Sequence, residues 1–318
     1  MSPSPKAPTT TRPSTTPAIR TDALTKRYGE VRALDGLTMT VERGEVFGFL
    51  GPNGAGKTTA VKLLLGLSRP TSGRAEVLGA PLGDRRTRAR VGYLPELFRY
   101  QPWLRAREVL ALHCELGGLP RTTWSAEIDA ALGLVGLADR AADMTGTFSK
   151  GMQQRLGLGV ALLGRPELVI LDEPTSALDP VGRTDVRSII RSVREAGTTV
   201  FLNSHLLTEV ERVCDRVAII DHGRVLEAGR LADFLGEDAV RIEATDLSAD
   251  AIDRLVSFGP VRRDGDWLTI QPIEPERVPD VVQAIVRAGG RVHAVDAGRG
   301  TLEDRFLALL SRDRGGSR

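Results

Sequence analysis

Long hydrophobic runs are missing from this chain of 318 residues. No stretch approaches the ~18 consecutive apolar residues that a membrane-spanning helix requires. Residues 156–164 form one of the longest apolar stretches, and it is far too short. If the protein works at a membrane, we therefore expect another chain to do the spanning.

Cysteine and net charge are also scarce. The two cysteines, Cys114 and Cys214, lie far apart and lack the spacing of metal ligands. This pattern favours a reduced interior in which both thiols are buried as small apolar groups. The formal net charge is +2, which is too close to balance to indicate a nucleic-acid partner.

The remaining composition, with 41% hydrophobic and 26% charged residues, is typical of a soluble globular protein. The length is enough for two domains. Residues 1–17 are nearly all Ser, Thr, Pro and Ala, so we expect a disordered tail without the apolar core of a signal peptide. Residues 18–231 form the predicted first domain and residues 232–318 the second.

A glycine-rich loop lies between a predicted strand, residues 46–50, and a predicted helix, residues 59–67. It has the pattern G-x-x-x-x-G-K-[ST], which cradles phosphates with backbone N–H groups at a helix N-terminus. We expect Lys57 to reach the outer phosphates and the Thr58 hydroxyl to bind Mg²⁺. The alternative, a glycine turn with a surface lysine, is disfavoured by the flanking strand and helix. The predicted nucleotide-binding residues here are Gly51, Pro52, Asn53, Gly54, Ala55, Gly56, Lys57, Thr58 and Thr59.

Polar residues follow two further apolar runs. Residues 168–171 lack polar alternation, which indicates a central parallel strand, and Asp172 and Glu173 come directly after it. Ligands bind at this end of such strands, so Asp172 is placed to hold Mg²⁺ and Glu173 to deprotonate a water. A solvated strand end is the alternative. His205 follows the run 198–202 and could contact a γ-phosphate, although a lone histidine is more often structural.

The other segments complete an α/β plan. Residues 97–148 predict a mostly helical subdomain inserted into the core, with apolar residues three and four positions apart. Ser149 is a good N-cap for a helix over residues 153–163. The second domain has the element order β-α-β-β-α-β of a ferredoxin-like split βαβ sandwich, with a hairpin signal at Asp264 and Gly265.

Together these motifs resemble the nucleotide-binding domain of an ABC transporter over residues ~20–230. The resemblance implies a P-loop NTPase core in which Asp172 and Glu173 are the Walker B aspartate and the catalytic glutamate, and His205 is the switch histidine. It also implies that Asp179 closes the D-loop and that Tyr28 stacks on adenine. Without the resemblance, Tyr28 packing a sheet edge is equally plausible.

The family signature, normally LSGGQ, departs from its usual form here. Ser149 and Gly151 are present, but Lys150 replaces the first glycine and Met152 the glutamine. Lys150 adds a positive charge that favours phosphate. Glu96 stands where a glutamine is usual, and its carboxylate can accept a hydrogen bond from water or bind Mg²⁺.

Both departures resemble the ABC-2 branch, especially the ATP-binding subunits of daunorubicin-type drug-resistance exporters. Residues 301–307 also resemble the end of that branch's C-terminal domain. The resemblance implies an ATPase that uses ATP and Mg²⁺, forms a head-to-tail homodimer and powers an ABC-2 type membrane permease. It further implies a cytoplasmic protein bound peripherally to the inner face of the cell membrane, exporting a drug or hydrophobic compound.

Three other classes of protein share some of these motifs but explain the sequence less completely. A soluble ABC-type ATPase acting in translation or DNA maintenance usually carries two ATPase domains, a long coiled coil or zinc modules. This sequence shows one ATPase domain and neither heptads nor Cys clusters. A P-loop kinase or GTPase leaves the signature and His205 unexplained. A non-enzymatic binding module would require Glu173 to be idle, which an ATPase assay decides.

Overall fold

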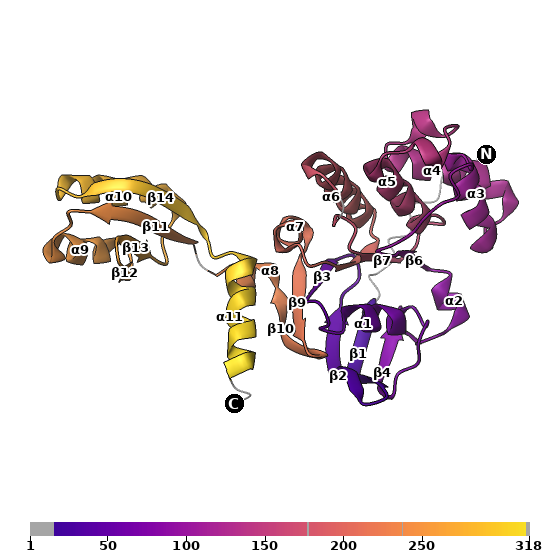
Figure 1. The fold of residues 1–318 in the computed structure, drawn as a ribbon, viewed down its shortest axis with the longest axis horizontal. Coiled ribbons are helices and arrows are strands. Elements are labelled where there is room, and N and C mark those ends of the chain that lie inside the picture. The colour runs from indigo at the N-terminus through magenta and orange to yellow at the C-terminus, as the bar shows by residue number, and fades with distance from the viewer. Residues whose placement is uncertain (1–15, 177, 237, 316–318) are drawn as a thin grey trace, which may run out of the picture. The chain divides into compact units, whose positions relative to one another are not determined.

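The computed structural model describes residues 16–176, 178–236 and 238–315 (Figure 1). Most of the predicted tail, residues 1–15, lies outside this range. The contacts between residues divide the chain into two compact units, Met1–Ala228 and Gly229–Arg318. This division falls close to the boundary expected after residue 231. Both cysteines are free thiols and buried, as predicted.

The first unit is built on a six-stranded sheet with the order β10-β9-β3-β8-β7-β6. From β9 to β6 the neighbouring strands pair in parallel. Every residue of β3, β7 and β8 is buried, which explains why their sequences lack polar alternation. The strands are β3 (Val46–Leu50), β6 (Val91–Leu94), β7 (Leu168–Asp172), β8 (Thr199–Asn203), β9 (Arg216–Asp221) and β10 (Arg224–Arg230).

Helices cover both faces of this sheet. In Figure 1, α5 (Lys150–Ala161), α6 (Pro180–Glu195) and α7 (Leu207–Val213) lie on one side and α1 (Lys57–Leu64) on the other. Helix α6 buries Val186, Ile189, Ile190 and Val193, at the three- and four-residue spacing of an amphipathic helix.

A second, antiparallel sheet has the order β2-β1-β4-β5. Its strands are β1 (Ile19–Tyr28), β2 (Val31–Val41), β4 (Ser72–Val77) and β5 (Ala80–Pro81). Strand β1 extends beyond the predicted residues 19–24, and its pairing with β2 shifts register between Thr21 and Tyr28. These irregularities explain why a simple alternating pattern did not show its full length.

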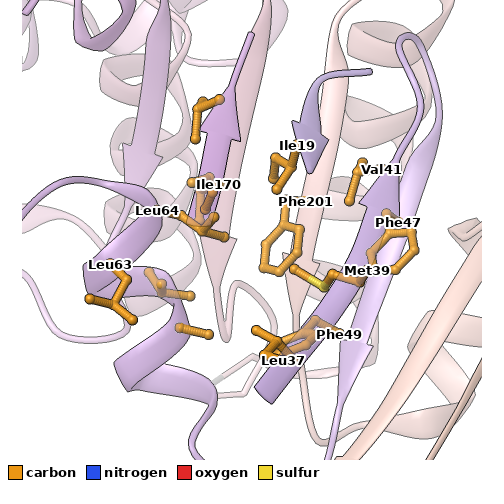
Figure 2. Close-up of a cluster of buried hydrophobic side chains, with 14 of the residues drawn as sticks. Ile19, Leu37, Met39, Val41, Phe47, Phe49, Leu63, Leu64, Ile170 and Phe201 are labelled. Carbon is orange, nitrogen blue, oxygen red and sulfur yellow. The ribbon is translucent and has the colours of Figure 1, made fainter. Parts of the chain in front are cut away.

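A hydrophobic core of the first unit lies between the two sheets and α1 (Figure 2). Phe201 lies at its centre and is fully buried. The Phe201 ring centroid is 5.9 Å from that of Phe47 and 5.3 Å from that of Phe49. The same cluster contains side chains from β1, β2 and α1: Ile19, Leu37, Met39, Val41, Leu63 and Leu64.

The segment between β5 and α5 contains the predicted helical subdomain. Its helices are α3 (Ala106–Leu116) and α4 (Trp124–Leu134), preceded by a short α2 (Arg85–Arg88) and joined by 3₁₀ turns at Arg121–Thr123, Ala138–Arg140 and Thr145–Thr147. Among the described residues, no helix combines the length and the apolar character needed to span a membrane.

The second unit contains a four-stranded sheet with the order β12-β13-β11-β14. Its neighbouring strands are all antiparallel. This is the topology of the predicted ferredoxin-like sandwich. The second strand of the hairpin, β13, lies in the sheet between β12 and β11, and a helix joins β11 to β12 in the sequence. The elements are α8 (Leu231–Leu235), β11 (Asp238–Thr245), α9 (Ala249–Leu255), β12 (Val261–Asp264), β13 (Trp267–Ile270), α10 (Val278–Arg287), β14 (Arg291–Arg299) and α11 (Leu302–Gly315), with 3₁₀ turns at Val256–Phe258 and Pro275–Arg277.

Truncating the central aromatic side chain tests this description of the core. We expect Phe201→Ala to lower the free energy of unfolding by about 3–5 kcal/mol, because the cavity left between two sheets cannot close. Leu97→Ala is the matched control: Leu97 is 87% exposed, so a change below about 0.5 kcal/mol is expected. Urea unfolding followed by circular dichroism measures both, and equal effects would contradict the assignment of Phe201 to the core.

Candidate nucleotide site

The loop between β3 and α1 has a backbone that only glycine can supply at two positions. Gly56 is the residue before α1 and has φ +102°, in the left-handed region. A Cβ atom there would lie 2.3 Å from the carbonyl oxygen of Ala33, and one at Gly51 would lie 2.4 Å from that of Ile220. The loop is therefore held closely between β2 and β9, with α1 beginning directly after it.

Lys57 is the first residue of α1, and its ammonium group is turned back under the loop. Nζ donates hydrogen bonds to the carbonyl oxygens of Gly51 (2.6 Å) and Pro52 (3.2 Å). Burial lowers the pKa of Lys57, and the nearby carboxylates of Glu173 and Asp172 oppose this effect. The loop thus encloses a cation close to the position that outer phosphates would occupy.

Two buried carboxylates lie at the end of β7. Burial raises the pKa of Asp172 and of Glu173 above the ordinary values. Asp172 accepts a hydrogen bond from the side-chain amide of Asn203, its neighbour on β8, and this bond opposes the rise. Glu173 has a left-handed backbone, with φ +52°, and its N–H donates to the carbonyl of Asn203 at 2.8 Å. The strained turn directs Glu173 away from the strand.

His205 contacts the second of these carboxylates. Its Nδ1 lies 2.8 Å from Oε2 of Glu173, and this contact lowers the glutamate pKa against the larger effect of burial. The histidine side chain is 50% exposed whereas that of Glu173 is 8% exposed. His205 therefore borders the solvent-facing side of the carboxylate that the sequence indicates as the base.

These groups line one cavity of about 530 Å³. Eleven of the residues predicted to bind nucleotide or metal, or to act in catalysis, lie in its wall: Pro52, Asn53, Gly54, Gly56, Lys57, Thr58, Thr59, Glu96, Asp172, Glu173 and His205. Gly51 and Ala55 belong to the same loop but not to the wall. The cavity therefore brings together the residues assigned to phosphate, metal and water.

Five residues of the wall were missed by the sequence reasoning: Val31, Arg32, Ala33, Asn203 and His222. Asn203 could have been found, because an amide at the end of the strand next to β7 must lie beside Asp172. His222 lies in the turn between β9 and β10, and the N–H of Gly223 donates to the carbonyl of Ala55 at 2.9 Å. No local pattern indicates that this turn or the β1–β2 hairpin reaches the loop.

Other predicted residues lie outside this cavity. Tyr28 is 48% exposed, with the Lys26 ammonium 4.9 Å from its ring centroid, and it pairs across the hairpin with Val31 in the cavity wall. Ser149 caps α5 and accepts from the N–H of Met152 at 3.2 Å. Asp179 caps α6 and accepts from the N–H of Gly182 at 2.8 Å.

Lys150 and Gly151 follow Ser149 in the first turn of α5 and are likewise absent from the cavity wall. This helix N-terminus, with its backbone N–H groups and the exposed Lys150, is a second place suited to an anion. Within one copy of the chain, the two features predicted to bind anions thus lie apart.

The comparisons with known proteins agree with this geometry. A family model described as ABC transporter matches residues 34–176. An uncharacterized ABC transporter ATP-binding protein of Nostoc sp. is 40% identical over 286 residues, which cover 89% of this chain and 84% of that protein. This chain belongs to the ABC transporter ATP-binding proteins.

Two further comparisons, one of sequence and one of structure, support this assignment. A daunorubicin resistance ATP-binding protein of Streptomyces coeruleorubidus is 38% identical over 307 residues, covering 93% of this chain and 97% of that protein. The solved structure of an ATP-binding subunit of an ABC transporter superposes with a TM-score of 0.62 at 31% identity, covering 68% of this chain and 91% of the other. The predicted P-loop NTPase fold, ATPase class and relationship to the drug-exporter branch are thus confirmed.

Removing the buried cation tests the cavity directly. We expect Lys57→Ala to weaken ATP binding by about tenfold to a hundredfold, because a charge-assisted hydrogen bond to phosphate is lost. Lys62→Ala is the matched control, since Lys62 is exposed on the same helix and does not line the cavity. Equilibrium binding of a fluorescent ATP analogue measures both variants, and equal affinities would rule out the loop as the phosphate site.

Proposed function

We propose that this chain is the ATP-hydrolysing subunit of an ABC-2 type exporter and that it uses ATP with Mg²⁺. The cavity supplies oxygen donors of the kind that Mg²⁺ prefers, in the Thr58 hydroxyl and the carboxylates of Asp172 and Glu96. Bound there, Mg²⁺ would neutralise charge on the phosphates. These protein groups are too few to fill the coordination sphere of Mg²⁺. Oxygen atoms of phosphate and water would supply the remaining ligands.

The roles of the chain's own residues follow from their positions. Lys57 and the N–H groups of the loop bind the outer phosphates and stabilise the charge that develops on them. Glu173 accepts the proton of the attacking water. His205, in contact with Glu173 at 2.8 Å, orients this carboxylate and reaches toward the γ-phosphate from the exposed side.

A complete site requires two copies of the chain in this proposal. The observation that carries it is the separation of the phosphate loop from Ser149, Lys150 and Gly151, which lie outside the cavity wall of their own copy. In a head-to-tail homodimer, this α5 N-terminus covers the nucleotide held by the other copy, with Asp179 beside it. Tyr28 stacks on the adenine, for which its exposed ring next to Val31 is suited.

Blocking the proposed base should separate ATP binding from hydrolysis. We expect Glu173→Gln to reduce kcat by about a hundredfold or more, because the amide cannot accept the proton, while ATP binding is retained. Size-exclusion chromatography with ATP should then show a trapped dimer.

The control for this variant is Glu167→Gln. Glu167 lies before β7 and pairs with Arg43 and Arg90 outside the cavity. Its substitution should leave kcat within about twofold of the wild type. A Glu173→Gln protein that hydrolyses ATP at the wild-type rate would show that another group is the base.

The transport role is proposed from the relatives and from the sequence of the signature. The similar protein of Streptomyces coeruleorubidus carries daunorubicin resistance in its name, which supports export of a drug or hydrophobic compound. We assign cargo selection to a separate ABC-2 type permease, with the ATPase bound peripherally at the cytoplasmic face of the membrane. The second unit is proposed to be an accessory domain for dimerisation or regulation.

The permease partner can be tested by membrane fractionation. A multi-span membrane protein encoded next to this chain should carry the ATPase into the membrane fraction when both are expressed, and the ATPase expressed alone should stay in the supernatant. Capture of the permease should also retain the ATPase after detergent extraction. An ATPase that remains in the supernatant in the presence of that protein would contradict this partnership.

A further inference from the structure

Helix α7 begins just after His205 in the chain. It runs from Leu207 to Val213, two residues after His205, and its N-cap residue Leu206 provides no side-chain cap. A helix of seven residues is marginally stable by itself, so contacts to the rest of the protein must hold it. Its buried residues are Glu209 and Val210. One of the two groups that anchor α7 is therefore a carboxylate.

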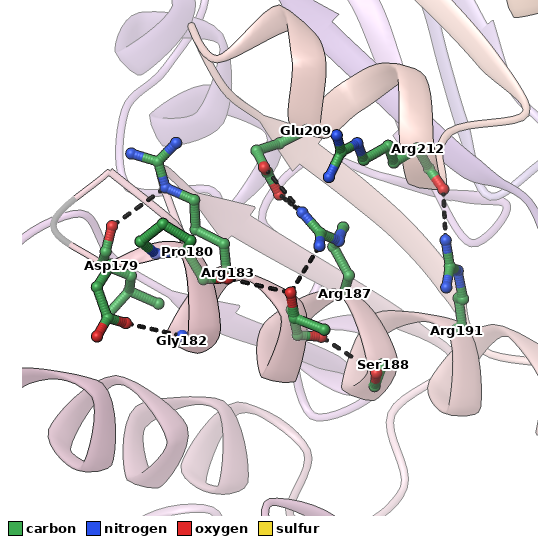
Figure 3. Close-up of polar contacts among 11 residues, drawn as sticks. Asp179, Pro180, Gly182, Arg183, Arg187, Ser188, Arg191, Glu209 and Arg212 are labelled. Carbon is green, nitrogen blue, oxygen red and sulfur yellow. Dashed lines mark hydrogen bonds and ion pairs between the residues drawn. The ribbon is translucent and has the colours of Figure 1, made fainter.

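The partner of this carboxylate is Arg187 on α6, as Figure 3 shows. Nη1 of Arg187 lies 2.9 Å from Oε1 and 2.8 Å from Oε2 of Glu209. The two side chains are only 12% and 8% exposed. One guanidinium nitrogen thus meets both carboxylate oxygens in a buried ion pair, and breaking such a pair is costly, so it holds the two helices together more firmly than the few apolar contacts of α7 would.

Arg187 is itself held from a second side. Its Nη2 donates to the Thr184 hydroxyl at 2.7 Å, and that hydroxyl donates to the carbonyl of Pro180 at 3.0 Å. Pro180 is the first residue of α6 and follows Asp179. A continuous chain of polar contacts thus runs from the first turn of α6 to the first turn of α7.

Other arginines on the same helix face make weaker contacts toward the end of α7. Arg191 donates to the backbone carbonyl of Arg212 at 3.0 Å (Figure 3), and Arg194 pairs with Asp215 through side chains that are 46% and 34% exposed. Both contacts lie farther along the chain from His205 than Glu209 does. They provide a matched comparison on the same helix.

We propose that Arg187 is a positioning residue for ATP hydrolysis: through Glu209 it holds α7 against α6 and so keeps His205 in contact with Glu173. The proposal rests on the ATPase reaction and on the role of Glu173 described above. It assigns no contact with ATP to Arg187 or Glu209, neither of which lines the cavity.

The test replaces the pair by apolar residues of similar size, as Arg187→Met with Glu209→Leu. Because no unpaired charge is left behind, the melting temperature should stay within about 3 °C of the wild type. Without the ion pair, kcat should fall by about tenfold or more, since small displacements of catalytic groups have large effects on rate. The KM for ATP should stay within about twofold, because the phosphate loop is untouched.

Arg191→Met is the control and should leave kcat, KM and melting temperature near the wild type. Arg187→Lys is the second variant in case the double variant does not fold: it keeps the charge but has one nitrogen, which cannot reach both Glu209 and Thr184, and kcat should fall several-fold at unchanged KM. The proposal is overturned if the folded double variant, or Arg187→Lys in its place, retains wild-type kcat. It is also overturned if the KM for ATP rises together with the fall in kcat. If the wild type itself does not hydrolyse ATP, the proposed function fails first, which separates the two outcomes.

Discussion

The burial of charge at one edge of a parallel sheet is the constraint on which the rest of this structure depends. Lys57, Asp172 and Glu173 are at most 8% exposed, in a region where an isolated charge is strongly disfavoured. The positive charge of Lys57 is partly balanced by the two carboxylates. Hydrogen bonds from Lys57 to backbone carbonyls and from Asn203 to Asp172 replace part of the hydration that these groups lose on burial. Phosphate and Mg²⁺ are the groups that we propose to complete this site.

Backbone geometry holds these charges in place. Gly51 and Gly56 allow the loop to pass within contact distance of the carbonyls of Ile220 and Ala33, where any Cβ atom would clash. Glu173 adopts a left-handed conformation and is kept there by its N–H bond to the Asn203 carbonyl. Side chains that must act on phosphate are thus attached to segments with little freedom to move.

Two of the residues predicted to bind nucleotide are also helix N-caps. Ser149 and Asp179 each accept a hydrogen bond from a backbone N–H at the start of a long helix, which satisfies a donor that would otherwise lack a partner. The remaining N–H groups of α5, with Lys150, still favour an anion. In the proposed homodimer these helix starts face the nucleotide of the second copy. The polar chain through Arg187 connects α6 to the helix that follows His205.

Features encoded by contiguous residues could be predicted from the amino-acid sequence. The loop from Gly51 to Thr58, the buried strand before Asp172 and the hairpin of the second unit could be predicted because each is encoded by local spacing and burial. The tertiary structure alone decided that Arg32 and His222 reach the cavity, since sheet pairing brings distant turns beside the loop. It also decided that Arg187 meets Glu209, because no periodicity within α6 or α7 specifies which buried charge on one helix faces the other.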